Sequence, residues 1–252
     1  NVLGVSIDAD GNEVLDPTQD FLFLSTENRI LLNGLLGVGY EFGEHQLRFT
    51  NVYIRDVLKE ARIQDGLDIQ NVDPVIPINR SFTNWFERQL FSTSLVGEFK
   101  FDDLKVDVRG TYAQSQRNSP YEREIQYVFE PRFNSYVNTL RQFTNARVAF
   151  SDLTDEIWAG AADFGYRLPT ERPVTVSAGY AYSDNTRNST RRDFRYNPVD
   201  ALPDEVSQQR PDFLLSPLNI NLYDILLEEV SVGLGAAAYE AGLAVHAAYG
   251  QV

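Results

Sequence analysis

Arginine and tyrosine side chains crowd one stretch of this chain of 252 residues. Guanidinium groups bind anions through charge-assisted hydrogen bonds, and they stack on aromatic rings. The stretch therefore suits an anionic or catecholate ligand, and its members are Arg187, Arg191, Arg192, Arg195 and Tyr196. A sparser set of the same residue types forms a second, weaker candidate: Tyr121, Arg123 and Arg141. The alternative is that each arginine pairs with a neighbouring Asp or Glu as an ordinary solvated charge.

Polar and apolar side chains alternate through the stretch from Trp85 to Ser119. A period of two places them on opposite faces of an extended strand. Asp102 and Asp103 interrupt the alternation and predict a two-residue turn between two antiparallel strands. The charged face of this hairpin carries Glu98, Lys100, Lys105, Asp107 and Arg109.

A turn of two residues also fixes which residues of the hairpin lie opposite each other. It pairs like charges, Lys100 with Lys105 and Glu98 with Asp107, and such direct opposition is unfavourable. Diagonal neighbours remain within reach of long side chains. The expected ion pairs are therefore Lys100 with Asp107, and Glu98 with Lys105 or Arg109.

The same alternation recurs along the chain and predicts about eight antiparallel strands. Outside the hairpin they cover residues 28–42, 46–60, 156–168, 174–183, 227–239 and 243 onward, with alternation also in parts of 120–154 and 185–194. The last two strands are expected to turn at Glu240-Ala241-Gly242. The faces are assigned by the same period: Asp163, Arg167 and His246 to the polar face, and Val245, Ala247 and Tyr249 to the apolar face.

Short and long connections alternate between the predicted strands. Polar loops are expected over 61–82 and 195–226, and residues 1–26 are expected to be irregular. Within that segment, Asp8-Ala9-Asp10-Gly11-Asn12 resembles the start of a calcium loop, but the closing acidic residue is absent and a surface loop is the better interpretation. Aromatic residues gather at both ends of the apolar faces. Loop asymmetry together with two aromatic rows is typical of a transmembrane β-barrel.

Composition narrows the classes of function. The chain has no Cys and a net charge of -14, which argues against disulfides, thiolate metal sites and nucleic-acid partners. No run approaches the roughly 18 apolar residues of a membrane-spanning helix. The two histidines, His45 and His246, stand apart from any nucleophile motif or distinct acidic pair. We therefore expect no enzyme activity, no catalytic residue, no bound metal and no cofactor.

Three stretches carry a resemblance to a known family: NRILLNGLLGVGYEFGEHQLRFTNVYIRD, WFERQLFSTSLVGEFKFDDLKVDVRGTYAQSQRNSPYE and GAAAYEAGLAVHAAYGQV. With these segments the chain resembles the barrel of a TonB-dependent outer-membrane receptor, over essentially its whole length. The resemblance implies that residues 1–252 are the middle part of a single all-β barrel domain. Short turns would face the periplasm and long loops the outside, and the plug domain and closing strands would be missing from this chain.

The resemblance also implies a function, which is TonB-dependent active transport across the bacterial outer membrane. The ligand would be one such as a ferric siderophore. The partners would be outer-membrane lipid, the plug domain of the same protein and TonB. The arginine and tyrosine sets would lie in extracellular loops and bind the ligand or lipopolysaccharide. The inward charges, Asp163 and Arg167 included, would line the lumen or contact the plug. A passive porin or, less favoured, a soluble β-sandwich binding module would share part of this pattern.

Overall fold

The computed structural model describes residues 2–7, 12–68, 77–141, 146–231 and 238–252. Within these ranges the chain forms one antiparallel sheet of ten strands, which confirms the all-β prediction. The order is β1-β2-β3-β4-β5-β7-β8-β10, with β6 beside β5 and β9 beside β8. The strands are β1 Val2–Ile7, β2 Glu13–Phe42, β3 His45–Asp68, β4 Ile78–Phe101, β5 Leu104–Glu130, β6 Ser135–Val137, β7 Ala146–Leu168, β8 Val174–Pro198, β9 Ile225–Glu229 and β10 Ala238–Gln251.

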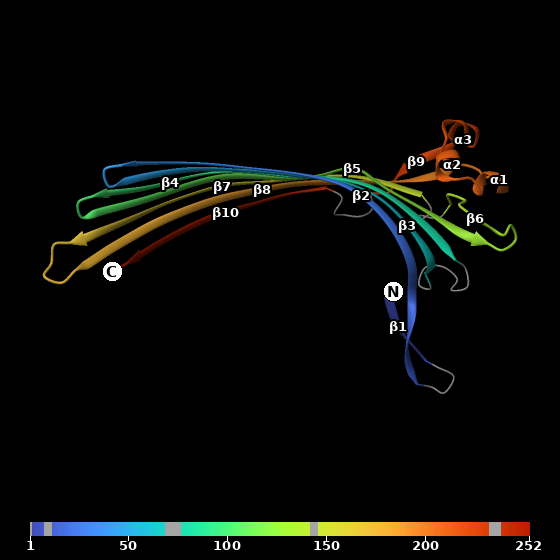
Figure 1. Ribbon diagram of the computed structural model, residues 1–252, viewed down its shortest axis with the longest axis horizontal. Coiled ribbons are helices and arrows are strands. Elements are labelled where there is room, and N and C mark those ends of the chain that lie inside the picture. Colours follow the sequence, from blue (N-terminus) through green and yellow to red (C-terminus); the bar gives the residue numbers. More distant parts are fainter. Residues whose placement is uncertain (1, 8–11, 69–76, 142–145, 232–237) are drawn as a thin grey trace.

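The strands are longer than the alternation predicted. β4 has 24 residues and β5 has 27, which corresponds to roughly 80–90 Å at about 3.3 Å per residue. Figure 1 shows them as a long, bent ribbon with the short turns at one end and the helices at the other. The expected irregular segment 1–26 contains β1 and the start of β2, and the expected loop 61–82 is shortened by β3 and β4. These parts carry no continuous apolar face, so they lacked the signal that marks a strand.

Tight turns set the register of the β2–β3 and β4–β5 hairpins. Gly43 has a φ of +60° between β2 and β3, and Asp102 has a φ of 50° between β4 and β5. A positive φ is what two-residue hairpin turns require, and Gly and Asp are among the residues that tolerate it best. Lys100 lies opposite Lys105 and Glu98 opposite Asp107, as the sequence predicted.

A bulge interrupts β5 halfway along its length. The ladder to β4 shifts register between Asn118 and Tyr121, and the ladder to β7 shifts between Ser119 and Glu122, on either side of Pro120. Proline has no backbone N–H to give to a ladder, so a bulge is where a central strand accommodates it. The Ser119 hydroxyl donates to the Trp85 carbonyl oxygen at 3.2 Å and ties the bulge to β4.

The predicted last hairpin is wrong. Residues Ala238–Gln251 form one continuous strand, β10, which pairs with β8 along its full length. Glu240, Ala241 and Gly242 therefore lie inside a strand and not in a turn. Gly242 is a typical turn residue but lies inside the strand, and the alternation of Leu243, Val245 and Tyr249 does not say which face of the sheet these side chains join. Residues 232–237 of the expected strand 227–239 lie outside the described residues.

Three short helices occupy the segment expected to be a polar loop: α1 Asp204–Ser207, α2 Pro211–Leu214 and α3 Pro217–Leu222. α2 and α3 begin with proline at a first-turn position, and the Ser216 side chain accepts from the Asn219 backbone N–H, which are common helix starts. None of the described helices is long and apolar enough to cross a membrane. The helices cover the ends of β5 and β9 and enclose the main hydrophobic core: Ile125, Tyr127, Leu140, Ala146, Val206, Leu214 and Ile225. We call this unit, with β6 and β9, the helical cap.

Closure into a barrel is not found. Among the described residues, β10 forms one open edge of the sheet and residues 20–42 of β2 form the other. Both edge strands run from the loop end toward the turn end (Figure 1). Direct pairing of these two edges would therefore be parallel, unlike every other contact in the sheet.

Candidate functional site

The half of the sheet nearest the turns has two dissimilar faces. The apolar face carries such residues as Tyr40, Leu95, Trp158 and Phe164, and the charged face carries Glu98 and its neighbours from the hairpin. Nothing in the described chain covers the apolar face, since Tyr40 is 63% exposed and Trp158 is 61% exposed. Large apolar patches of this kind mark a surface that another apolar phase or molecule covers.

Aromatic rings form two rows across the strands of the apolar face. In the row near the turns, the His45 ring centroid lies 5.0 Å from that of Phe42 and 4.9 Å from that of Phe101. In the row farther from the turns, the centroids of Tyr112 and Trp158 are 4.4 Å apart. The predicted gathering of aromatic residues at two levels is therefore confirmed. Ring contacts of this kind add modestly to cross-strand pairing.

The faces predicted for β10 are reversed. Val245 pairs with Ser183 and Tyr249 with Gly179, both on the charged face of β8. Tyr249 donates to Asp163 Oδ1 at 2.9 Å on that face. His246 instead joins the apolar face, where its Nδ1 lies 2.6 Å from the Tyr180 hydroxyl oxygen. The register to β8 decides this assignment, because alternation within β10 does not say which of its faces joins which face of the sheet.

Several ion pairs lie on the charged face close to the turns. Lys105 Nζ lies 2.9 Å from Asp107 Oδ2 and 4.0 Å from Glu98 Oε2. The expected contact of Glu98 with Lys105 is therefore present, whereas Asp107 pairs with Lys105 and not with Lys100. Arg109 lies 2.5 Å from Asp163 on β7. All these side chains are partly or largely exposed, so each pair contributes little to stability.

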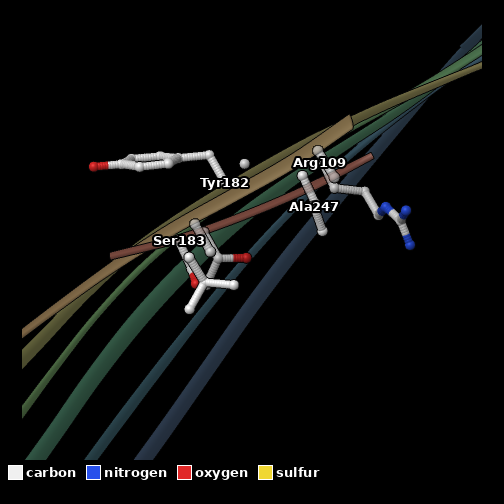
Figure 2. Close-up of a pocket in the computed structure, with 10 residues that line it drawn as sticks. Arg109, Tyr182, Ser183 and Ala247 are labelled. Carbon is white, nitrogen blue, oxygen red and sulfur yellow. The ribbon is translucent and has the colours of Figure 1, made fainter. Parts of the chain in front are cut away.

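A shallow hollow of about 210 Å³ lies on the charged face beside these pairs, and small side chains form its floor. Figure 2 shows Ser183 and Ala247 on one side of the sheet and Tyr182 on the other. Arg109 and Thr111 complete its rim. A second hollow nearer the turns includes Lys105, Asp107, Asp163 and Arg167. The predicted inward charges Asp163 and Arg167 thus lie on one surface with those of the hairpin.

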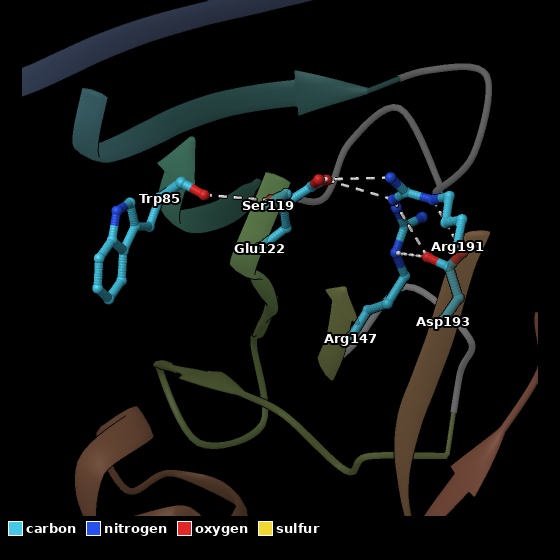
Figure 3. A network of polar contacts seen from close by, with 6 residues as sticks. All are labelled: Trp85, Ser119, Glu122, Arg147, Arg191 and Asp193. Atoms are coloured by element: carbon cyan, nitrogen blue, oxygen red, sulfur yellow. Dashed lines mark hydrogen bonds and ion pairs between the residues drawn. The ribbon is translucent and has the colours of Figure 1, made fainter. Parts of the chain in front are cut away.

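Beyond the bulge, Arg191 of β8 and Arg147 of β7 contact carboxylates of β8 and β5 (Figure 3). Arg191 donates to Asp193 Oδ2 at 2.9 Å and lies 3.3 Å from Glu122 Oε2. Arg147 Nε lies 3.3 Å from Asp193 Oδ1. Asp193 is only 6% exposed, and its carboxylate lies between the guanidinium groups of Arg147 and Arg191. This network joins β5, β7 and β8.

The other three arginines of the predicted ligand set are also paired. Arg187 pairs with Asp155, Arg192 with Glu229 at 2.8 Å and Arg195 with Glu228 at 2.8 Å. Hydrogen bonds from Arg192 and Ser231 lower the pKa of Glu229 to about 2. These contacts match the alternative that the sequence left open, in which the arginines neutralise neighbouring acids.

The sheet divides the predicted ligand residues between its two faces. Arg187, Arg191 and Arg195 lie on the charged face, because they alternate with residues paired across the apolar face. Tyr121, Arg123 and Tyr196 gather on the opposite face, where burial and the nearby Tyr121 raise the pKa of Tyr196. The Arg123 guanidinium carbon lies 5.9 Å from the centre of the Tyr121 ring. Arg141 is exposed, away from these contacts.

One pair of cations on the charged face was not singled out from the sequence. Arg88 on β4 lies directly opposite Arg117 on β5. Counting outward from the Asp102-Asp103 turn would have found it, because the register set by that turn holds until the bulge. No cluster of three or more potential metal ligands occurs in the described ranges. Asp8 to Gly11 of the calcium-loop-like segment lie outside them.

Comparison with known proteins finds no match to this chain among protein-family models, curated proteins or solved structures.

Proposed function

We propose that this chain is part of the wall of an outer-membrane transport barrel, similar to that of TonB-dependent receptors. Its charged face would line the path of a ligand taken up by a bacterial cell. The observation that carries the proposal is the exposed apolar face with its two aromatic rows, opposite a charged face on the same strands. Outer-membrane barrels combine lipid-facing apolar bands, aromatic girdles and polar interiors in this way.

The dimensions of the apolar face also support a membrane location. On β5 and β7 the apolar alternation extends from the turn to Tyr112 and Trp158. Each stretch has about ten residues, which is the length that a tilted strand needs to cross a bilayer. Beyond this level both faces carry charged residues, so the remaining length of the strands would project into water.

A soluble β-sandwich is the less favoured alternative, because its apolar face would be buried against a second sheet. In the described chain only the helical cap packs on the sheet, and it covers the end far from the turns (Figure 1). The open edges fit a piece of a larger barrel. Since β2 and β10 run in the same direction, an odd number of further strands must lie between them to keep the whole wall antiparallel.

Tryptophan quenching by brominated lipid tests the membrane assignment. The two tryptophans lie at different distances from the turns. Trp158 is in the aromatic row farther from the turns, and Thr93 of β4 lies at the same level. Trp85 is eight residues farther along β4 than Thr93, about 26 Å at 3.3 Å per residue. In vesicles containing brominated phospholipid, Trp85→Phe, which retains Trp158, should be strongly quenched. Trp158→Phe should be quenched little. Equal, weak quenching of both variants would support the soluble alternative.

An uptake experiment separates active transport from passive flow. Cells that take up the ligand through this protein should lose uptake when the proton-motive force is collapsed. Uptake that continues unchanged would favour a passive porin. The growth of a deletion strain under iron limitation then tests the ferric siderophore as ligand.

A further inference from the structure

Within the described residues, the charged face contains three places where two cations lie directly opposite each other on neighbouring strands. They are Lys100 with Lys105, Arg147 with Arg195, and Arg88 with Arg117. Like charges in this position repel, because the Cβ atoms are only about 5 Å apart. Such a pair is therefore destabilising unless an anionic group compensates it.

Two of the three pairs are compensated within the chain. Lys105 contacts both Asp107 and Glu98. Arg147 is paired with Asp193 and Arg195 with Glu228. Each of these cation pairs thus has two carboxylates close by.

The Arg88–Arg117 pair is compensated less, because it has one carboxylate nearby and shares that carboxylate with a third arginine. The nearest carboxylate, Asp56, receives two hydrogen bonds of 2.8 Å from Arg29 and lies 3.8 Å from Arg88. Arg117 has no carboxylate partner among the described residues, and its guanidinium carbon lies 5.9 Å from the centre of the Phe86 ring. Both arginines are exposed, so they can be reached from the solvent on the charged face.

The surroundings of this pair are positive although the chain as a whole has a net charge of -14. Around it, the charged face carries four arginines and two aspartates: Arg29, Asp56, Arg88, Arg117, Asp155 and Arg187. Asp56 is engaged by Arg29 and Asp155 by Arg187. Four guanidinium groups thus face two carboxylates, and the excess positive charge lies at Arg88 and Arg117.

We propose that Arg88 and Arg117 form a binding subsite for a small multivalent oxyanion, a molecule carrying two or more carboxylate or phosphate groups. Two planar guanidinium groups on adjacent strands present several N–H donors to one side of the sheet, which suits bidentate recognition of such groups. The subsite deepens the proposed function, because it names the charge of the ligand that would pass along this face. It replaces the paired arginines of β8 as the better anion site.

The test measures binding of inorganic pyrophosphate and of succinate to the whole protein in detergent micelles at low ionic strength. At least one probe should bind saturably, and added salt should weaken the binding because exposed charges are screened. Arg88→Gln and Arg117→Gln should each weaken it by about tenfold, the loss of one charge-assisted contact. Arg117→Lys should lose less. The control Arg172→Gln, in the exposed turn between β7 and β8, removes the same charge and should bind as the unaltered chain does.

Thermal unfolding at low salt separates a binding role from a structural one. Since Arg117→Gln removes repulsion, its unfolding midpoint should stay unchanged or rise, whereas loss of a structural contact would lower it. Equal probe affinities in Arg117→Gln and Arg172→Gln would overturn the subsite. The membrane proposal would survive that result if lipid quenches Trp158. Conversely, a soluble protein that still binds the probe through Arg117 would reject the membrane proposal and leave the subsite intact.

Discussion

The two ends of the sheet treat their apolar residues in opposite ways. At the turn end, side chains such as Trp158 and Tyr40 are exposed on a single layer of strands. At the loop end, the helical cap buries Leu214, Ile125 and Ile225 almost completely. Only the loop end has a core of the kind that stabilises a water-soluble domain. The turn end depends on surroundings that the described chain does not provide, which is why we propose lipid there.

Polar side chains, like apolar ones, are exposed at the turn end and become buried at the loop end. Exposed ion pairs on the turn-end charged face contribute little. Asp193 at the loop end is nearly buried between two arginines, and Asn138 of the cap is fully buried. The Tyr127 hydroxyl donates to the Gln209 carbonyl oxygen at 2.7 Å, so the cap is also joined to β5 by a polar contact.

The largest expected effect comes from removing core volume in the cap. Leu214 is fully buried, so Leu214→Ala should lower the opening free energy of the cap by about 3 kcal/mol, through lost burial and the remaining cavity. Leu36→Ala, at a position 58% exposed on the apolar face, should change stability in detergent by less than about 0.5 kcal/mol. Amide hydrogen exchange of the two regions measures both values. Equal losses would show that the turn end has a core of its own.

An intermediate effect is expected from acid at β9. The pKa of Glu229 is lowered from 4.5 to about 2 by Arg192 and Ser231, so its contribution to stability is complete above pH 4.5 and is lost as the pH falls toward 2. The hydrogen-exchange rate of the β9 amides, corrected for the intrinsic rate at each pH, should therefore rise relative to that of the β4 amides as the pH falls from 4.5 toward 2. Arg192→Gln should raise the pKa of Glu229 and shift the loosening to higher pH. An unchanged acid response in this variant would contradict the assignment.

The smallest effect tests which face of β10 carries Tyr249. A Cβ at Gly179 would collide with the Tyr249 ring and the Asp163 carboxylate. Because these are the ends of flexible side chains, Gly179→Ala should weaken β10 by only about 1 kcal/mol. Gly110→Ala lies on the apolar face with no atom within 4 Å of the new Cβ, so it should leave the stability of β10 unchanged. Hydrogen exchange of β10 amides compares the two, and a silent Gly179→Ala would argue against Tyr249 on the charged face.

Local sequence signals were enough to predict the β4–β5 hairpin. Alternation marked its strands and faces, and Asp102-Asp103 fixed the opposition of Lys100 and Lys105. Both signals are local, since a strand's period and a turn's length act over a few residues. The same counting reaches Arg88 and Arg117, so this candidate subsite was also within reach of sequence reasoning.

The tertiary structure alone decided the C-terminal part and the open edges. Alternation separates the two faces of β10 but does not say which of them joins the apolar face of the sheet. Only the ladder to β8 shows that Glu240-Ala241-Gly242 does not turn and that His246 lies on the apolar face. The helices have four to six residues, too few for a 3.6-residue period to appear. Three arginines of β8 looked available in sequence because their partners Asp155, Glu228 and Glu229 lie on other strands, whereas Arg191 pairs also with Asp193 of its own strand. Long-range pairing, and not local pattern, determines which charges remain without a partner.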